Sequence, residues 1–252
     1  MISHSIFKDL RVLNTRPVDQ AASLSQIIEA GGGQSINIPT LSIDAIPPQN
    51  WLSNLPILSS IQQSIFTSPN AAQYFFNALR EACIDWPKTI QVIAIGKGTT
   101  KVLSDYHVTV NCCPDQSDSE HIIALPSLQS IKNMPILLIK GEGGRTIIHD
   151  AILLRGGLPH IVNTYRRSMP RNNKKQLMRL WQIDGIDMIV FTSEEAMRNL
   201  FCLLDKEAHR WLQEKPCVVL SERLAKGAEA LGINKTHVIT DLLIAPAFKH
   251  QG

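Results

Sequence analysis

Two turns that carry hydroxyl groups occupy matching places in the two halves of this 252-residue chain. Thr67-Ser68 and Thr192-Ser193 each end a short apolar run and precede a helical pattern, and the two pairs are 125 residues apart. The first turn of a helix has free backbone N–H groups, which attract carboxylates and phosphates. Serine at this place is also an ordinary N-cap. The turns therefore predict either a duplicated anion-binding device or a duplicated scaffold alone.

Similar turns with a cation, a hydroxyl group or a glycine recur along the chain. In an open parallel sheet such turns lie beyond the carboxyl ends of the strands, where ligands bind. Backbone N–H groups, hydroxyls and scattered positive charges suit a small polyanionic ligand. The candidate binding residues are Arg16, Thr67, Ser68, Gly96, Lys97, Thr99, Arg145, Thr192, Ser193 and Ser221.

The familiar motifs of cofactor and metal sites do not occur in the sequence. Residues 141–146, GEGGRT, begin like a dinucleotide-binding loop, but Thr146 stands where that motif has its last glycine. The eight histidines lack metal-ligand spacing, and there is no G-x-S-x-G nucleophile motif. We therefore expect no cofactor and no metal, so that an enzyme of this kind would depend on positioning its substrate.

Tyr165 is the candidate catalytic residue. It lies in an extended stretch beside Arg166-Arg167, where a linker could place it in the middle of a cleft. A phenol is protonated at neutral pH and can donate its proton to a leaving hydroxyl group. A tyrosine that packs on the protein surface is the alternative, and spacing alone slightly favours it.

Composition narrows the class of protein. The chain is 44% apolar, with a net charge of +3 and one dense basic stretch over residues 166–175, which is less basic than a typical nucleic-acid-binding surface. No run approaches the ~18 apolar residues of a membrane span, and the N-terminus lacks a signal-like apolar segment. Five cysteines without C-x-x-C spacing suggest reduced, mostly buried thiols. We expect a cytoplasmic protein that binds neither nucleic acid nor membrane.

Three segments in each half share the order strand, turn, helix. We expect them to correspond at an offset of 125 residues throughout, with strands near residues 10–14, 65–66 and 92–95 matched by strands near 136–139, 189–191 and 217–220. Equivalent positions at this offset are Leu13/Leu138, Gly31/Gly156, Gly32/Gly157, Ile36/Ile161, Phe66/Phe191, Ala71/Ala196, Phe76/Phe201 and Leu79/Leu204. Alternating strands and helices predict an α/β fold with two similar lobes, each a parallel sheet flanked by helices.

The division into lobes is less clear from the pattern. A cut near residue 125 is the simplest, but the proline-punctuated, β-rich stretches 35–48 and 160–170 occupy equivalent places and look like linkers. If both cross between lobes, each lobe combines parts of both repeats. Periodicity leaves the two divisions open.

Several stretches taken together resemble one known family. They are VLNTRPVDQAASLSQIIEAGG, IFTSPNAAQYF, AIGKGTTKVL, IKGEGGRTIIHDAILLRGG and VNTYRRSMP, and they are similar to uroporphyrinogen-III synthase of the bacterial type. The resemblance implies two α/β lobes, one from residues 1–38 plus 168–252 and the other from 43–163, joined by a two-stranded linker at 39–42 and 164–167.

The resemblance also implies a reaction. Family members are lyases of tetrapyrrole (haem) biosynthesis that close hydroxymethylbilane to uroporphyrinogen III without a cofactor, with loss of water and inversion of ring D through a spiro intermediate. The family's proton donor falls on Tyr165, and its cleft hydroxyl positions fall on Ser68, Thr99 and Ser193. The substrate would come from hydroxymethylbilane synthase, and the protein would be a monomer. Residues 221–224, SERL, depart from the Gly and Thr that many relatives carry there.

Two other classes of protein remain as alternatives. A non-catalytic two-lobed binding protein for a small polyanionic ligand would also have duplicated α/β lobes and a linker. Such proteins usually carry a signal peptide. A tetrapyrrole-modifying methyltransferase would need a glycine-rich loop after its first strand, where Arg16-Pro17 stands.

Overall fold

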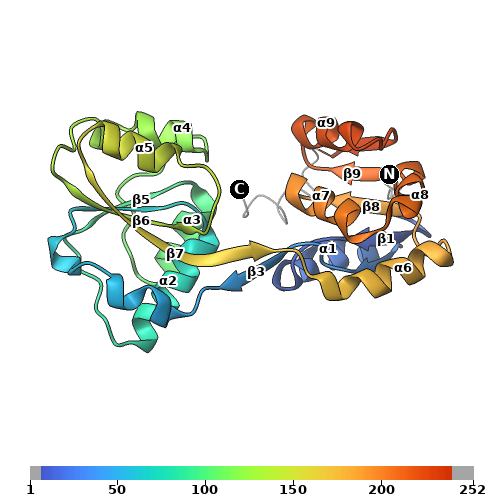
Figure 1. Ribbon diagram of the computed structural model, residues 1–252, viewed down its shortest axis with the longest axis horizontal. Helices are drawn as coiled ribbons and strands as arrows, with labels where there is room; N and C mark the ends of the chain where they lie inside the picture. The colour runs from blue at the N-terminus through green and yellow to red at the C-terminus, as the bar shows by residue number, and fades with distance from the viewer. Residues whose placement is uncertain (1–6, 240–252) are drawn as a thin grey trace. The chain divides into compact units, whose positions relative to one another are not determined.

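The computed structural model describes residues 7–239. It confirms the α/β class, with two sheets flanked by helices (Figure 1). Contacts between residues divide the described chain into two compact units. Unit 1 consists of residues 7–43 and 168–239, and unit 2 consists of residues 44–167.

Unit 1 is built on a sheet with the strand order β10-β9-β8-β1-β2, in which each neighbouring pair is parallel. Its elements are β1 Arg11–Asn14, α1 Val18–Ala30, β2 Gln34–Asn37, η5 Arg171–Asn173, α6 Lys174–Gln182, β8 Met188–Phe191, α7 Glu194–Leu203, α8 Lys206–Glu214, β9 Cys217–Val219, α9 Glu222–Ala230 and β10 Thr236–Val238.

The central strands of unit 1 are buried on both faces, as expected for a parallel sheet with helices on each side. Because successive strand residues point to opposite faces, Val12 packs with Leu24 and Ile28 of α1. Leu13 belongs to the opposite core, which includes residues of α6, α7, α8 and α9.

Unit 2 has the strand order β3-β7-β6-β4-β5. Strands β5, β4, β6 and β7 pair in parallel, and β3 and β7 cross the boundaries between the units. The elements are β3 Ser42–Ala45, η1 Pro48–Asn50, η2 Leu52–Asn54, η3 Leu58–Ser60, β4 Gln63–Phe66, α2 Pro69–Glu81, β5 Gln91–Ala94, α3 Lys97–Asp105, α4 Ser119–Ala124, η4 Pro126–Leu128, β6 Pro135–Gly141, α5 Ile147–Leu154 and β7 Leu158–Ser168.

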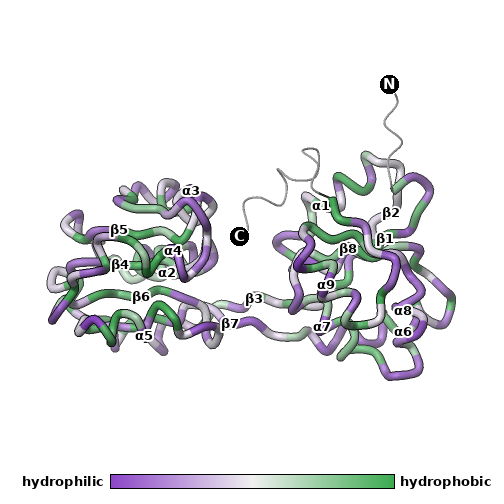
Figure 2. Tube along the Cα trace, turned by 90° about the horizontal axis from the view of Figure 1, so that it is seen from above, coloured by the Kyte–Doolittle hydropathy of each residue, from purple (hydrophilic) through white to green (hydrophobic). Residues whose placement is uncertain are grey.

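The sheet of unit 2 also has two cores, and Figure 2 shows its strands β4, β5 and β6 as largely hydrophobic. One core is aliphatic and joins β4, β5 and β6 to α4 and α5. The other is aromatic, where Phe66 of β4 packs against Phe75 and Phe76 of α2 and against Trp86, with ring centroids 5.6 to 6.1 Å apart.

The two units have the same topology, which supports an internal duplication. The order β9-β8-β1-β2 in unit 1 corresponds to β5-β4-β6-β7 in unit 2. Ser68 and Ser193, 125 residues apart, cap α2 and α7 in the same way. His107 and Gly232, also 125 apart, follow α3 and α9 with φ of 59° and 85°.

The prediction of one uniform offset is wrong for the first strand–helix–strand segment, which corresponds at 124 residues. Gly32 and Gly156 both have left-handed φ, of 82° and 73°. They accept hydrogen bonds from the backbone N–H groups of Asp9 and Asn133, which are likewise 124 apart. The predicted pairs Leu13/Leu138, Gly31/Gly156, Gly32/Gly157 and Ile36/Ile161 are therefore each displaced by one residue. Arg16 corresponds to Lys140, and Leu41 corresponds to Tyr165.

The cysteines and the helices bear on two further expectations. All five cysteines are free, but only Cys217 is buried and Cys83 and Cys202 are exposed, so the expectation of mostly buried thiols is wrong. Among residues 7–239, no helix combines the length and the apolar character needed to cross a membrane.

Candidate functional site

The predicted site residues of unit 2 gather at one edge of its sheet. Because β4, β5, β6 and β7 are parallel, their carboxyl ends lie at the same edge. Thr67 and Ser68 follow β4, Gly96 and Lys97 follow β5, and Tyr165 lies near the end of β7. The structure therefore brings these residues to one end of unit 2.

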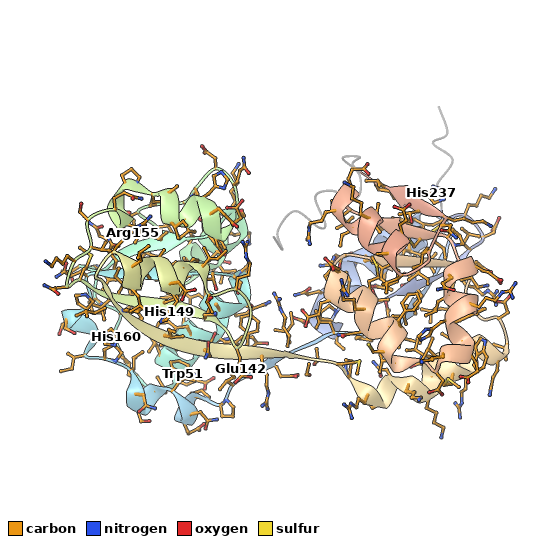
Figure 3. The ribbon with its side chains drawn as sticks, turned by 45° about the horizontal axis from the view of Figure 1, so that its top comes forward. Trp51, Glu142, His149, Arg155, His160 and His237 are labelled. Carbon is orange, nitrogen blue, oxygen red and sulfur yellow. The ribbon has the colours of Figure 1, made fainter. Side chains whose placement is uncertain are left out.

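Tyr165 is buried at this edge, with 4% of its surface exposed. The Ser68 hydroxyl donates to its phenol oxygen at 3.1 Å, and the ring of Tyr74 lies 6.2 Å from its ring. The backbone N–H of Glu142, the residue that Figure 3 labels beside β7, donates to the Tyr165 carbonyl at 2.7 Å. Both ends of the residue are thus held within unit 2.

Ser68 connects the start of α2 to this tyrosine. Its Oγ accepts a hydrogen bond from the backbone N–H of Ala71 at 3.0 Å, which makes it the N-cap of the helix. The hydroxyl hydrogen of Ser68 is directed to the Tyr165 oxygen. Because Tyr165 accepts from Ser68, its own O–H remains available to a further acceptor.

The turn after β5 contributes one exposed charge and one buried hydroxyl. Lys97, the first residue of α3, is exposed, whereas Thr99 is completely buried. Within the described part of the chain, the Thr99 hydroxyl has no hydrogen-bond partner. Gly96 provides space, because a Cβ there would lie 2.0 Å from the Ser117 hydroxyl.

Arg145 follows β6 and already has a partner. Its guanidinium forms a two-pronged ion pair with the carboxylate of Glu120 in α4, and both side chains are about half exposed. The hydrogen bond from Arg145 holds the pKa of the Glu120 carboxyl below its usual range. An anionic ligand would therefore have to compete with Glu120 for this cation.

In unit 1 the corresponding edge carries Thr192, Ser193 and Ser221. The Ser193 hydroxyl accepts from the backbone N–H of Ala196 at 3.1 Å, and that of Ser221 accepts from Leu224 at 3.3 Å. The N-cap interpretation is therefore confirmed for both serines, and for Ser68 as well. Thr192 and both serines are half-buried.

Arg16 lies at the same edge, after β1, but it is 1% exposed. Its backbone N–H donates to the side-chain carbonyl of Asn14 at 3.2 Å. Burial lowers the pKa of its guanidinium from 12.5 to about 10, which nearby Asp19 partly opposes. Arg16 thus keeps its positive charge at neutral pH in a poorly solvated place.

Sequence reasoning missed residues that hold these turns in place. Thr40 donates to the Ala196 carbonyl at 2.8 Å, and Thr164 donates to the Ala71 carbonyl at 3.4 Å, so each threonine fastens its stretch of chain to a helix start. The sequence signal for these residues is the repeat of threonine at positions 40 and 164, which becomes visible only at an offset of 124.

Over residues 7–239, no three His, Cys, Asp or Glu side chains gather as they would around a metal ion.

The chain has two duplicated α/β units. Each unit has a serine-capped helix start at the carboxyl edge of its parallel sheet, and one of these edges also has a buried tyrosine. These features define a class of two-unit α/β proteins suited to an anionic ligand. The sequence model of the family described as "Uroporphyrinogen-III synthase HemD" matches residues 22–240. The chain belongs to this family.

Individual relatives agree with that assignment. The uroporphyrinogen-III synthase of Escherichia coli (strain K12) is 28% identical over 229 residues, covering 88% of this chain and 92% of the relative. That of Chlorobaculum parvum is 28% identical over 242 residues, covering 94% and 95%.

Solved structures show the same fold. A mutant uroporphyrinogen III synthase from the extremely thermophilic bacterium Thermus thermophilus has a TM-score of 0.67 at 14% identity, covering 96% of this chain and 100% of that chain. The uroporphyrinogen-III synthetase of Helicobacter pylori has a TM-score of 0.55 at 13% identity, covering 96% and 99%.

Proposed function

We propose that this chain is a lyase that closes hydroxymethylbilane to uroporphyrinogen III in tetrapyrrole biosynthesis, with loss of water and inversion of ring D. The family match over residues 22–240, a range that includes Ser68 and Tyr165, carries the proposal. The alignments also span 92% and 95% of the length of the two relatives, so the comparison covers nearly all of each relative.

Tyr165 is the proposed acid of the first step. Its phenol gives a proton to the hydroxyl of the hydroxymethyl group on ring A, the C–O bond breaks and water leaves. The lone pair of the ring A nitrogen supplies the electrons and forms an azafulvene that is protonated on nitrogen, whose positive charge balances the negative charge left on Tyr165. The Ser68 hydroxyl at 3.1 Å donates to the Tyr165 oxygen and stabilises the negative charge that develops there.

The remaining steps depend on how the substrate is folded. The substituted carbon of ring D attacks the azafulvene and forms the spiro intermediate, which fragments and recloses with ring D inverted. The proton lost in the last step restores the phenol of Tyr165. Holding ring D against ring A is a matter of orientation. Proximity and orientation of two reacting groups can lower an activation barrier by ~7–11 kcal/mol.

The carboxylates of the substrate are the proposed ligands of the helix starts. The N-terminus of α2 at Ser68, of α7 at Thr192-Ser193 and of α9 at Ser221 would each accept an anion. Arg16, Lys97 and Arg145 are the proposed cations, and Thr67, Gly96 and Thr99 the remaining proposed contacts. Arg145 would exchange Glu120 for the substrate.

The organisation of the protein is also part of the proposal. We expect residues 39–42 and 164–167 to act as a linker, which is supported by the change of unit at 43/44 and 167/168. We expect a monomer in the cytoplasm that receives its substrate from hydroxymethylbilane synthase. Sizing chromatography with and without that synthase would test the oligomeric state and the handover.

A coupled assay tests the function. Hydroxymethylbilane is generated in situ, this protein is added, and the oxidised porphyrin isomers are separated by chromatography. We expect predominantly type III, against type I in the control without this protein. Persistence of type I at high concentrations of folded protein would overturn the proposal and favour the alternative, a binding protein for a polyanionic ligand.

A further inference from the structure

Gly141 lies against the phenol end of the Tyr165 side chain. A Cβ built on Gly141 would be 2.5 Å from Cζ, 2.8 Å from Cε2 and 2.9 Å from the phenol oxygen. Contacts below about 3 Å between such atoms are repulsive, so any side chain at this position would displace the ring or the strand. The atoms concerned form the phenol end of the ring, which is its reactive end.

The need for glycine here is one of space. Gly143 and Gly144, two and three residues further on, have left-handed φ of 70° and 74°, and a Cβ added at either would have no atom within 4 Å. Gly141 is different, because its φ lies outside the left-handed range and its surroundings are crowded. The residue is thus explained by the approach of Tyr165 alone.

The backbone around Gly141 directs the tyrosine ring to this place. β6 and β7 pair as Lys140 with Asn163 and then as Gly141 with Tyr165, so the register shifts between Lys140 and Gly141. Ser68, from a different element, donates to the phenol oxygen. Gly141 and Ser68 therefore confine the phenol from two elements, the end of β6 and the start of α2.

Unit 1 supplies a comparison within the same chain. At the offset of 124 residues, Gly141 corresponds to Pro17 and Tyr165 corresponds to Leu41. The unit that lacks the tyrosine has a residue with a full side chain in place of the glycine. The glycine thus accompanies the phenol and is not a general requirement of the repeated fold.

We infer that Gly141 is a positioning residue for Tyr165, because its missing side chain lets the phenol reach the place where Ser68 holds it and where it delivers its proton. The inference rests on the proposed acid role of Tyr165 and names a further determinant of it. We expect a side chain at position 141 to move the phenol away from Ser68, while Ser68 and the other proposed contacts of the substrate carboxylates keep their own side chains.

The first test is spectroscopic and does not depend on activity. The chain has three tyrosines, so protein labelled with ¹³C in the tyrosine rings has three sets of ring signals, and Tyr165→Phe assigns one of them. In Gly141→Ala we expect the signals of Tyr165 and of its neighbour Tyr74 to shift. Those of Tyr106, which stacks on Phe76 at 5.4 Å, should stay in place.

Gly227→Ala is the matched control for the first test. Gly227 lies within α9 of unit 1, where a Cβ would have only ordinary contacts with Glu194, at 3.6 Å. We expect its tyrosine signals to match those of the wild type. An unmoved Tyr165 signal in folded Gly141→Ala would overturn the positioning inference.

The second test is kinetic. Because a displacement of about 1 Å can cost on the order of 10²-fold in rate, we expect Gly141→Ala to lower kcat about 10- to 100-fold with KM changed less than about threefold. In the Tyr165→Phe background the same change should have little further effect, since the group it misplaces is gone. An equal loss in both backgrounds would overturn the inference.

The outcomes separate this inference from the proposed function. Tyr165→Phe with wild-type turnover would contradict the acid role, whereas the ring signals report the position of Tyr165 whatever its role. If Gly141→Ala alone does not fold, Gly141→Ala/Tyr165→Leu decides, because it imitates the Pro17 and Leu41 pair of unit 1. A cooperative melting transition in the double variant supports the inference, and a double variant that also fails to fold contradicts it.

Discussion

The same backbone arrangement occurs beside Ser68 in unit 2 and beside Ser193 in unit 1, but it presents different side chains. Each serine caps a helix, and in each unit a buried threonine donates to the carbonyl three residues after that serine. The residue after the threonine is Tyr165 in unit 2 and Leu41 in unit 1, and both are buried.

This difference separates what the fold provides from what the reaction requires. The duplicated frame fixes a side chain next to a helix start in both units, through the same hydrogen bonds. Leucine leaves that place apolar, whereas tyrosine adds a proton donor that the capping serine can reach. Under the proposed function, both units bind anions, and unit 2 alone supplies the acid from this position.

The largest expected effect comes from giving unit 2 the residue of unit 1. Tyr165→Leu removes the phenol, and because general acid catalysis contributes ~10²–10⁴-fold, we expect kcat to fall about 10²-fold. Tyr165→Phe, which retains the ring, should lose a similar factor. Turnover is measured in the coupled assay with chromatographic separation of isomers.

Tyr106→Phe is the control for that comparison. Its hydroxyl donates to Asn77 within unit 2, at 2.7 Å, and is not part of the proposed site. We expect turnover like that of the wild type. A Tyr165→Phe protein within about threefold of wild-type turnover would remove the functional distinction between the two units.

The next effect compares the two serines directly. Ser68→Ala and Ser193→Ala each remove an N-cap, so we expect each to lose about 1 kcal/mol in free energy of unfolding. Only Ser68 contacts Tyr165, so Ser68→Ala should also lower kcat about 10-fold, which corresponds to the loss of one hydrogen bond to a developing charge. Ser193→Ala should act on KM.

Urea unfolding and steady-state kinetics measure both parts of this prediction. Ser68→Thr keeps the hydroxyl and should restore most of the lost kcat. Equal kcat losses in Ser68→Ala and Ser193→Ala would mean that the serines act only as caps or as substrate contacts, and that the contact with Tyr165 has no catalytic role.

A smaller difference between the units concerns acid stability. In unit 1, Arg11 donates to Asp187 at 2.7 Å, and this hydrogen bond lowers the pKa of Asp187 from 3.8 to about 2. The corresponding residues of unit 2 are Pro135 and Gln62, which cannot form an ion pair. A depressed carboxyl pKa stabilises the fold above the unfolded pKa and stops doing so as the pH falls through the folded pKa.

We therefore expect the ion pair of unit 1 to lose its contribution between about pH 4 and pH 2, by about 1 kcal/mol, since both side chains are partly exposed to solvent. Urea unfolding at a series of pH values measures this. Asp187→Asn removes the carboxyl, so its unfolding free energy should depend less on pH in that window. Parallel curves for the two proteins would contradict the expected contribution.

The pattern of strands, turns and helices was sufficient to predict the α/β class and the duplication, because parallel strands and helix starts have strong local signals. The one-residue change of offset was not predictable from those signals. Gly31-Gly32-Gly33 matches Gly156-Gly157 equally well at 124 or 125 residues, and so do the neighbouring leucines of β6. The left-handed φ of Gly32 and Gly156 and the hydrogen bonds that these glycines accept distinguish the two.

The contacts of the site were predictable in part. Serine after a strand indicates a cap, and Ser68, Ser193 and Ser221 are caps. The hydrogen bond from Ser68 to Tyr165 joins residues 97 apart and depends on the register shift at Gly141, for which the sequence has no local signal. Arg145 was expected to face a ligand, but its pairing with Glu120 arises from the packing of α4, which periodicity does not specify.

The smallest predicted effect tests the duplication at the ends of α3 and α9. His107 and Gly232 occupy the same left-handed position, which costs a residue with a side chain roughly 1 kcal/mol and costs glycine little. His107→Gly should therefore stabilise the protein by about 0.5–1 kcal/mol, as measured by urea unfolding.

The reverse change in unit 1 completes this comparison. Gly232→Ala introduces a Cβ at φ of 85°, 2.6 Å from the amide of the Gln213 side chain, and should destabilise the protein by about 1 kcal/mol. Opposite signs for the two substitutions are expected, because the repeated backbone demands the same conformation at both places. If His107→Gly lost stability, the His107 side chain would contribute more to unit 2 than its strained backbone costs, and the equivalence of the two positions would not extend to their energetics.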